Sequence, residues 1–512
     1  MTFVSVLFAR QEDQVAAQRA TKPTFFKDLN IDQIVNSITV DRSEYALEPF
    51  FSYPLTKIDP ILYRQEVLKD LEHAPLLEQV RLFARTMREV RATLNQSAKL
   101  YYPHHKQAWF LDAVSLYCDA VRRFAADLSA TAIESRGLRS VSDYLVSYVS
   151  SAGFQSLAEE ANALVVDLAE LDYCVLIGGS GFTVRNYKSE ADYSAEILDT
   201  FDKFKQGAVN DYLAQYRSAP EAMNHIEAKI VEFVAKLHPD LFSRLSSFCE
   251  LNSGLIDETI GVFDREIQFY VAYLEYLSRF TEHGLQFCFP RLSTNSKAVR
   301  ACEAFDLALA QKLLGAGAAI VCNDFVLSGR ERILVVTGPN QGGKTTFARM
   351  IGQLHYLASI GCPVPGRTVQ LFLFDQLFTH FEREERIETL RGKLEDDLVR
   401  VYDILDRATS QSVVIMNEIF TSTTLADQIF LSKRVMGRLL QLDLIGVWVT
   451  FVEELASFSD QTVSMVSGIA ADDPTLRTFK IMRRPADGLA YALAIAKKYR
   501  LTYGQIRERM AS

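Results

Sequence analysis

Apolar residues recur at three- and four-residue spacing through most of the chain between Leu76 and Phe289. This spacing places them on one face of a helix. The stretches LLEQVRLFARTMREVRATL and FDREIQFYVAYLEYLSRF keep it over several turns, with charged residues between the apolar ones. The pattern therefore predicts a region of long amphipathic helices.

One segment interrupts this helical pattern. In the segment from Tyr173 to Tyr187, two runs rich in β-forming residues flank the glycines Gly178, Gly179 and Gly181. Such runs around a glycine-rich turn are typical of a β-hairpin. We expect a hairpin inserted between helices.

The pattern changes after Pro290. Short β-branched runs (AAIVC, RILVVTG, SVVIMNE, LIGVWVTF) then alternate with helical segments, which is typical of an α/β domain with a mainly parallel sheet. The predicted fold class is thus α plus α/β. We expect a helical core-like segment at residues 1–110, a long-helix region with the hairpin at 111–289, and the α/β domain at 290–512.

Composition supports a globular protein. The chain has 512 residues, of which 48% are hydrophobic and 23% charged, and this length fits about three domains. The net charge of −9 gives no overall basic surface of the kind that strong non-specific nucleic-acid binders show, although a local basic face stays open. The seven cysteines are widely spaced without a C-x-x-C pair, so we expect reduced thiols.

No segment predicts secretion or a membrane anchor. The first residues, MTFVSVLFARQED, lack the positive region of a signal peptide. The longest weakly polar stretch, Leu313 to Cys322, is far shorter than the roughly 18 residues that cross a bilayer. We expect a soluble, cytoplasmic protein with no membrane partner.

The strongest chemical motif is TGPNQGGKTT, which follows the predicted strand Ile333–Val336. Gly338, Gly343, Lys344 and Thr345 satisfy the pattern G-x-x-x-x-G-K-[ST] between a strand and a helix. The glycines allow backbone N–H groups to surround phosphates, the lysine neutralises phosphate oxygens, and the threonine hydroxyl is suited to Mg²⁺. The alternative is a glycine-rich turn that only caps a helix.

A second predicted strand, SVVIMNEIF, ends in Asn417 and Glu418. Ligands of open α/β sheets bind at the carboxyl ends of the strands, so Glu418 is the candidate for polarising an attacking water. The alternative is a surface glutamate, which the phosphate loop makes the weaker interpretation.

These motifs resemble those of the DNA mismatch repair MutS family. TGPNQGGKTT is similar to that family's phosphate loop, NEIFTSTTLAD to its acidic strand and signature segment, and VTFVEEL to the segment that follows. Farther upstream, YPLTKIDPILYRQEVLKDLE resembles the opening of the family's helical core. The likeness is strongest from Asn323 to Leu455.

The resemblance implies an ABC-type ATPase that forms a head-to-tail homodimer, uses ATP and Mg²⁺, and completes each nucleotide site with the neighbour's signature segment. It implies a catalytic role for Glu418, Lys344 and Asn417, and metal binding by Thr345 and Asn417. The implied nucleotide-binding residues are Asn323, Gly338, Pro339, Asn340, Gln341, Gly342, Gly343, Lys344, Thr345, Thr346, Thr423 and Thr424.

The signature threonines also have a simpler interpretation. Thr423 and Thr424 stand where a helix is predicted to begin, so their hydroxyls and the free N–H groups there are suited to a phosphate across a dimer interface. Simple N-capping of the helix is the alternative, and both roles are compatible.

The chain departs from the family pattern at functional positions. Asn417 replaces an aspartate, so we expect weaker Mg²⁺ binding and slow hydrolysis. Phe451 replaces a histidine, and Phe420-Thr421-Ser422 replaces Gly-Arg-Gly before the signature threonines. Ile320 stands where relatives place a phenylalanine that stacks on adenine, so we expect base recognition by apolar contact alone.

Mismatch recognition by the family's usual Phe-x-Glu wedge is not expected. That pattern occurs at Phe248-Cys249-Glu250 and at Phe451-Val452-Glu453, inside the helical region and the ATPase. About 50 residues precede the core-like segment at Tyr53, too few for two further domains.

The sequence thus supports a MutS-like, ATP-switched dimeric clamp that binds DNA in repair or recombination without the mismatch wedge. Arg81, Arg85, Arg88 and Arg91, in one predicted helix, are candidates for phosphate contacts, although a solvated face explains them equally well. The alternative hypothesis is a nucleotide-switched dimer that acts on a protein partner and not on DNA.

Overall fold

The computed structural model of the chain describes residues 4–178, 181–189, 223–382, 392–469, 477–486 and 501–511. The fold divides into two compact units. The α/β unit comprises Met1–Glu72, Glu134–Leu138 and Arg265–Ser512, and the helical unit comprises His73–Ile133 and Arg139–Asp264. Residues 1–72 thus pack with the α/β part of the chain.

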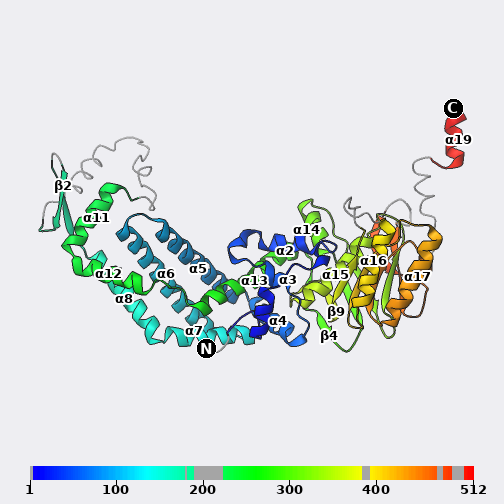
Figure 1. Cartoon of the computed structure of the whole chain (residues 1–512), viewed down its shortest axis with the longest axis horizontal. Coiled ribbons are helices and arrows are strands. Elements are labelled where there is room, and N and C mark those ends of the chain that lie inside the picture. The colour runs from blue at the N-terminus through cyan, green and yellow to red at the C-terminus, as the bar shows by residue number, and fades with distance from the viewer. Residues whose placement is uncertain are drawn as a thin grey trace. The chain divides into compact units, whose positions relative to one another are not determined.

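Long helices build the helical unit, as the spacing of apolar residues predicts. Their bounds are α5 (Ala74–Lys99), α6 (Pro103–Ala130), α7 (Arg136–Val149), α8 (Ala152–Ala169), α11 (His225–Leu237), α12 (Pro239–Leu251) and α13 (Glu258–Thr281), of which α7 and α13 also contribute residues to the α/β unit. Helices α5 and α6 lie side by side (Figure 1). Their apolar faces meet where Phe83 stacks on Phe124 with ring centroids 4.3 Å apart, and Phe263 packs on both rings.

An antiparallel hairpin follows α8, where the sequence predicts one. Strand β1 (Tyr173–Gly178) pairs with β2 (Gly181–Asn186), with Tyr173 opposite Asn186 and Gly178 opposite Gly181.

The main sheet of the α/β unit has the strand order β10-β11-β12-β7-β13-β14. All neighbouring strands in it are parallel except β13 and β14, which confirms the predicted mainly parallel sheet. The strand bounds are β7 (Ile333–Thr337), β10 (Leu377–His380), β11 (Val413–Asn417), β12 (Ile445–Val449), β13 (Thr462–Ile469) and β14 (Arg477–Arg483). Strands β11, β12 and β7 are parallel neighbours in this order. Their carboxyl ends therefore lie next to one another at one edge of the sheet, where ligands of open α/β sheets bind.

A second sheet has the order β4-β9-β5-β6, and β3 pairs with β8. The bounds are β3 (Phe287–Cys288), β4 (Arg291–Ser293), β5 (Val299–Ala304), β6 (Asn323–Leu327), β8 (Val364–Pro365) and β9 (Thr368–Phe372). The helices of the α/β unit, besides the end of α13, are α1 (Gln11–Gln18), α2 (Ile31–Thr39), α3 (Glu48–Ser52), α4 (Ile58–Leu71), α14 (Leu307–Gly315), α15 (Lys344–Ser359), α16 (Lys393–Arg407), α17 (Leu425–Gln441) and α19 (Tyr503–Ala511).

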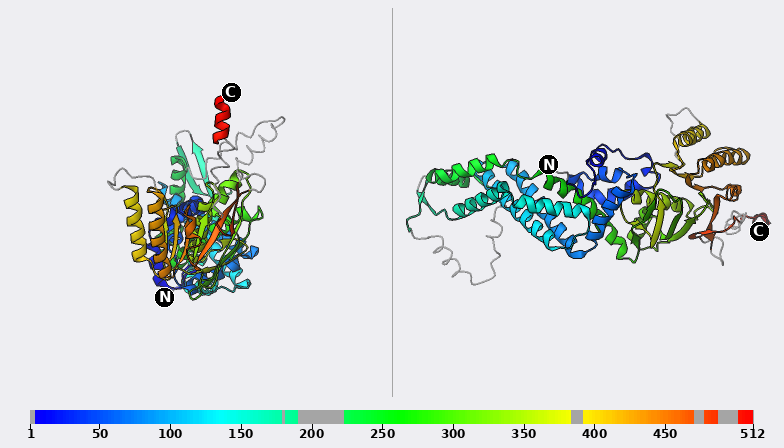
Figure 2. Two further views of the ribbon diagram at one scale, coloured as in Figure 1. Left: turned by 90° about the vertical axis from the view of Figure 1, so that its right-hand side faces the viewer. Right: turned by 90° about the horizontal axis from the view of Figure 1, so that it is seen from below.

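Alternate residues of the central strands face different helices. Val414 and Met416 of β11 share a buried cluster with residues of α16 and α17, which lie next to each other beside the sheet (Figure 2). Ile415 points to the other face, where it contacts α15 at Gly352. Side chains in a strand alternate between faces, so each helix layer packs against alternate residues of the apolar run VVIM.

Helix α15 is enclosed, and every residue from Met350 to Ser359 is buried. The N-terminal segment supplies part of this cover. Gln353 donates to the Leu29 carbonyl at 2.9 Å, and the Tyr356 hydroxyl donates to the Phe51 carbonyl at 2.5 Å. Residues 1–72 therefore complete the α/β unit by closing over α15.

Arg64 of α4 lies at the far end of α15 and is fully buried. Its guanidinium donates to the carbonyls of Ile360 at 2.9 Å and Leu7 at 3.2 Å. The rings of Phe8 and Phe269 lie 5.2 and 5.3 Å from its Cζ atom. Burial lowers the pKa of Arg64, while cation–π contacts and the carbonyls at the helix end stabilise its charge.

In the described part of the chain, no helix is both long and apolar enough to cross a membrane.

Gly361 follows α15 with φ +83°, and a Cβ atom there would lie 2.7 Å from the Cβ atom of Arg64. We expect Gly361→Ala to lower the free energy of unfolding by about 1–2 kcal/mol through its backbone conformation and by a further 1–3 kcal/mol or so through overpacking. Gly284→Ala is the matched control, because Gly284 has φ +79° with open space around it. Thermal melting of both variants measures the difference, and equal melting temperatures would contradict the close packing at Arg64.

Candidate functional site

The glycine-rich loop predicted to bind phosphates connects the buried strand β7 to α15. Its glycines are required by close packing: a Cβ atom at Gly338 would lie 2.9 Å from the Cβ atom of Ser467, and one at Gly342 would lie 2.1 Å from the Ser467 Oγ atom. Ser467 of β13 also donates to the Gly342 carbonyl at 2.7 Å. Strand β13 therefore packs against the loop through Ser467 and fixes its position.

The start of α15 has the properties of an anion site. Its N-cap is Gly343, with φ +89° and no side-chain cap. The N–H groups of a first helical turn lack partners within the helix, and the helix dipole favours a negative charge there. The loop and α15 thus present backbone donors at the same place.

Lys344 is the first residue of α15 and is 4% exposed. Its Nζ atom donates to the carbonyls of Gly338 and Pro339, both at 3.0 Å, and lies 3.8 Å from Glu418 Oε1. Burial lowers the pKa of Lys344, and the Glu418 carboxylate offsets part of this effect. The structure thus brings the predicted phosphate-binding lysine and the predicted catalytic carboxylate together.

Phe451 contacts the same lysine. Its ring centroid lies 4.4 Å from Lys344 Nζ, a distance at which an ammonium group is attracted to an aromatic face. The residue that replaces the family's histidine therefore offers a cation–π contact to Lys344 in place of a hydrogen-bond donor.

Asn417 and Glu418 lie at the carboxyl end of β11. Asn417 is 7% exposed, and its Oδ1 atom has no hydrogen-bond partner in the described part of the chain. A buried amide oxygen without a partner suits a hydrated cation, and Thr345 in the cavity wall adds a hydroxyl oxygen. The residues present thus fit Mg²⁺. Burial raises the pKa of Glu418, and Lys344 offsets part of this effect.

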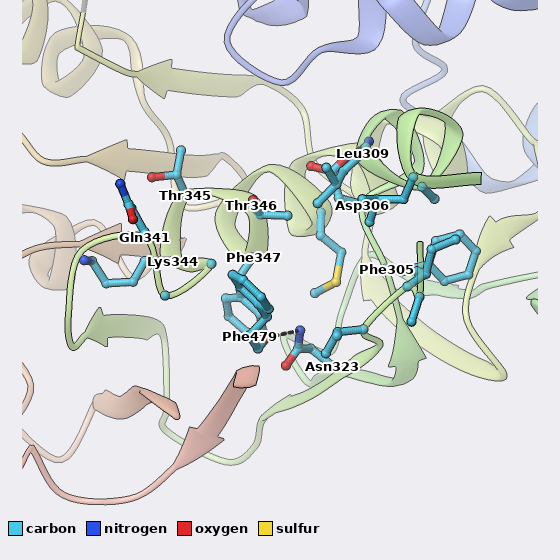
Figure 3. A pocket seen from close by; sticks show the side chains of 18 of the residues that line it. Phe305, Asp306, Leu309, Asn323, Gln341, Lys344, Thr345, Thr346, Phe347 and Phe479 are labelled. Carbon is cyan, nitrogen blue, oxygen red and sulfur yellow. Dashed lines mark hydrogen bonds between the residues drawn. The ribbon is translucent and has the colours of Figure 1, made fainter. Parts of the chain in front are cut away.

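A cavity of about 780 Å³ opens beside this loop (Figure 3). Its polar end holds the phosphate loop with Lys344 and Glu418, and its other wall is apolar, from α14 and the segment before β6. Predicted site residues among the lining are Asn323, Asn340, Gln341, Gly342, Gly343, Lys344, Thr345, Thr346 and Glu418. The lining does not include Gly338, Pro339, Asn417, Thr423 or Thr424.

Phe479 is a residue of this cavity that the sequence interpretation missed. It comes from β14, has φ +55° and is 48% exposed. Figure 3 shows its ring in the cavity between Lys344 and Asn323. Ile320 also lines the cavity, so an apolar side chain and the Phe479 ring, which comes from a different strand, both face it.

Asn323 positions this ring. Its Nδ2 group donates to the Phe479 carbonyl at 3.2 Å, and its Oδ1 atom accepts from the Ile481 amide at 2.7 Å. The amide nitrogen and the amide oxygen of Asn323 thus both bond to the backbone of β14. Asn323 lines the cavity as predicted, but its observed contacts attach β14 to β6. No motif near Phe479 marks it, because its partner Asn323 is 156 positions away.

The signature threonines cap helix α17. Thr424 is the N-cap residue, its hydroxyl accepts from the Asp427 amide at 3.2 Å, and the Thr424 and Thr423 hydroxyls lie 2.8 and 3.4 Å from the Asp427 carboxylate. Both threonines border solvent. Capping is therefore the role observed within one chain.

The arginines of α5 divide into two pairs. Arg81 forms an ion pair with Glu78 at 2.6 Å, and Arg91 forms one with the buried Asp264. Arg85 and Arg88 are exposed. Of the four arginines, Arg85 and Arg88 are thus the ones with exposed side chains.

A buried strand, a glycine-rich loop and a buried lysine at the start of a helix define this part of the chain as a P-loop nucleotide-binding domain. Residues 334–501 match the family model of MutS domain V. This segment belongs to that family, whose members are ABC-type ATPase domains, and the chain is a distant homologue of MutS and MutS2.

Three relatives illustrate the likeness. The chain is 30% identical over 195 residues to a protein named Endonuclease MutS2 from Gemmatimonas aurantiaca, covering 37% of this chain and 23% of that protein. It is 25% identical over 311 residues to DNA mismatch repair protein MutS of Chlorobaculum tepidum, covering 59% and 34%. A MutS2 of Thermomicrobium roseum is 29% identical over 177 residues, covering 34% and 22%. The chain thus matches about a third or less of each relative's length.

Asn323→Ala removes both hydrogen bonds to β14. A hydrogen bond contributes about 0.5–1.5 kcal/mol net, so we expect hydrogen exchange at the Ile481 amide to accelerate by up to about tenfold. Asp324→Ala is the control, because Asp324 follows Asn323 in β6 and its carboxylate accepts from the Glu303 amide of β5 at 2.6 Å. Hydrogen exchange followed by mass spectrometry distinguishes the two segments. Unchanged exchange at Ile481 would contradict the role of Asn323.

Proposed function

We propose that the protein binds and hydrolyses ATP at this cavity and that ATP switches a MutS-like dimer between states. The observation that carries the proposal is the meeting of the phosphate loop, Lys344 and Glu418 at one end of a cavity whose other end is apolar and aromatic. This arrangement suits a nucleotide, whose phosphates are charged and whose base has flat faces that stack on apolar and aromatic side chains.

The phosphates would bind at the start of α15. There the loop N–H groups donate to phosphate oxygens, and Lys344 exchanges its contacts with the Gly338 and Pro339 carbonyls for stronger ones to phosphate. The base would lie against Ile320 and the Phe479 ring, because aromatic rings stack well on nucleobases.

Glu418 would act as the general base. Burial raises its pKa, which brings the carboxylate closer to the range in which it accepts a proton from water, while Lys344 opposes this shift. Mg²⁺ would be held through Thr345 and Asn417 and would neutralise charge on the transferred phosphoryl group. Asn417 has no negative charge, so we expect slow turnover.

The exposed signature segment supports a homodimer. Thr423 and Thr424 lie at the start of α17, where free N–H groups favour an anion, and Leu425 and Phe430 on that helix are 66% and 58% exposed. We propose that these residues complete the nucleotide site of a second copy in a head-to-tail dimer.

DNA is the proposed partner of the helical region, with a role in repair or recombination. The names of the relatives, a DNA mismatch repair protein and endonucleases, support it, and the side chain of Arg85 is exposed on α5. We further propose that residues 1–110 form the core, 111–289 the lever and clamp, and 290–512 the ATPase, in the cytoplasm.

The alternative is a nucleotide-switched dimer that acts on a protein partner. The net charge of −9 favours it, because strong electrostatic attraction to DNA needs positive charge.

Glu418→Gln tests the ATPase. The amide cannot accept a proton, so we expect the turnover rate to fall by about 10²–10⁴-fold while ATP binding persists. In the wild-type protein, the acidic limb of kcat/KM is expected above pH 4.5, because burial raises the pKa of Glu418 from that value. Steady-state phosphate release measures both. Exposed Glu395 on α16 provides the control variant Glu395→Gln, and full turnover by Glu418→Gln would contradict the proposal.

Salt dependence tests the partner. If DNA binds through phosphates, its affinity and any stimulation of ATP hydrolysis fall steeply between about 50 and 200 mM salt. Arg85→Ala is expected to lower the slope of log affinity against log salt by about one, while the exposed Arg19 of the α/β unit provides the control Arg19→Ala. Turnover indifferent to duplex, mismatched and branched DNA, without salt-sensitive binding, would favour the protein partner.

A further inference from the structure

The turn that carries Glu418 has a rare backbone conformation. Glu418 has φ +50° and Phe420 has φ +59°, in the left-handed region that residues with a side chain seldom adopt. Such conformations persist where the surroundings hold them, often at functional sites. The contacts of this turn therefore determine where the Glu418 carboxylate points.

Three elements hold the turn by its backbone. The Glu418 amide donates to the Val449 carbonyl of β12 at 2.9 Å, and Gln428 of α17 donates to the Ile419 carbonyl at 3.3 Å. The third contact comes from α16, where Asp397 Oδ2 accepts from the Phe420 amide at 3.2 Å. Phe420 itself is fully buried in the apolar cluster between the sheet and α16.

Asp397 has a second partner. Its Oδ1 atom lies 3.3 Å from Nε2 of His380, which is the last residue of β10 and is fully buried. Burial disfavours the Asp397 carboxylate, but His380, the Phe420 amide and Arg400 outweigh this effect and lower its pKa. The carboxylate is thus kept ionised, and a hydrogen bond to an ionised acceptor is stronger than one to a neutral acceptor.

Neither His380 nor Asp397 lines the nucleotide cavity. They act on it through one backbone group, in a chain that runs from His380 through Asp397 to the Phe420 amide. That amide lies two residues from the Glu418 carboxylate.

We propose that His380 and Asp397 are positioning residues that hold the turn 418–420 so that Glu418 points its carboxylate at the attacking water. This proposal rests on the proposed ATPase function. A misplacement of a catalytic group by about 1 Å reduces a rate by about 100-fold, so loss of the pair slows catalysis without removing a nucleotide contact.

Two variants, Asp397→Ala and Asp397→Asn, test the residue that accepts from the Phe420 amide. A third variant, His380→Gln, tests its buried neighbour. We expect Asp397→Ala to lower kcat by about 10- to 100-fold, while the affinity for a fluorescent non-hydrolysable ATP analogue stays within about twofold. Asp397→Asn keeps an oxygen acceptor for the Phe420 amide, so we expect it to recover part of the rate. Asp403→Asn, at an exposed position of the same helix, is the matched control.

Hydrogen exchange at the Phe420 amide gives a second readout that needs no turnover. We expect it to accelerate in Asp397→Ala and not in Asp403→Asn. Unchanged kcat in Asp397→Ala overturns the proposal, as does a parallel loss of kcat, analogue affinity and melting temperature, which a merely structural role would produce. Absence of ATP hydrolysis in the wild-type protein, or hydrolysis that Glu418→Gln leaves intact, overturns the proposed function instead.

Discussion

Burial of helix α15 is the constraint on which the α/β unit depends. One end of the helix begins at Gly343 without a side-chain cap, and the remainder lies among β11, β12 and the N-terminal segment. Such a helix places unpaired carbonyls at its other end, and Arg64 meets the Ile360 carbonyl there. The position of the phosphate loop is thus tied through a rigid helix to α4 and to residues 1–72, which explains why these distant segments form one unit.

The carboxyl ends of three adjacent strands determine the chemistry. Strand β7 leads into the loop, β11 ends at Asn417, and β12 ends next to Phe451. Because these ends adjoin, a lysine, a carboxylate and an aromatic ring from separate segments gather around the same point. Low exposure there strengthens electrostatic interactions, and Asn417 contributes an uncharged amide at this point.

Two departures from the family pattern, at Asn417 and Phe451, lie at the same end of the site. Asn417 brings an uncharged amide to the end of β11, and Phe451 offers an aromatic face to Lys344 in place of an imidazole. Both positions lie next to Lys344 or Glu418, while Phe479 of β14 lines the same cavity.

The sequence by itself determined the elements whose residues are contiguous. The period of apolar residues predicted the long helices and the mainly parallel sheet, and one stretch of ten residues, TGPNQGGKTT, specified the phosphate loop. Glu418 was found because it ends a strand. Tertiary structure alone decided which separate segments meet around this site. Phe479 enters the cavity from β14, Asn323 of β6 attaches that strand, and His380 of β10 contacts Asp397 of α16. Local patterns encode backbone conformation and amphipathic faces, but they carry no information on which strand edges and buried polar groups of separate elements pair, because that is decided by packing of the whole core.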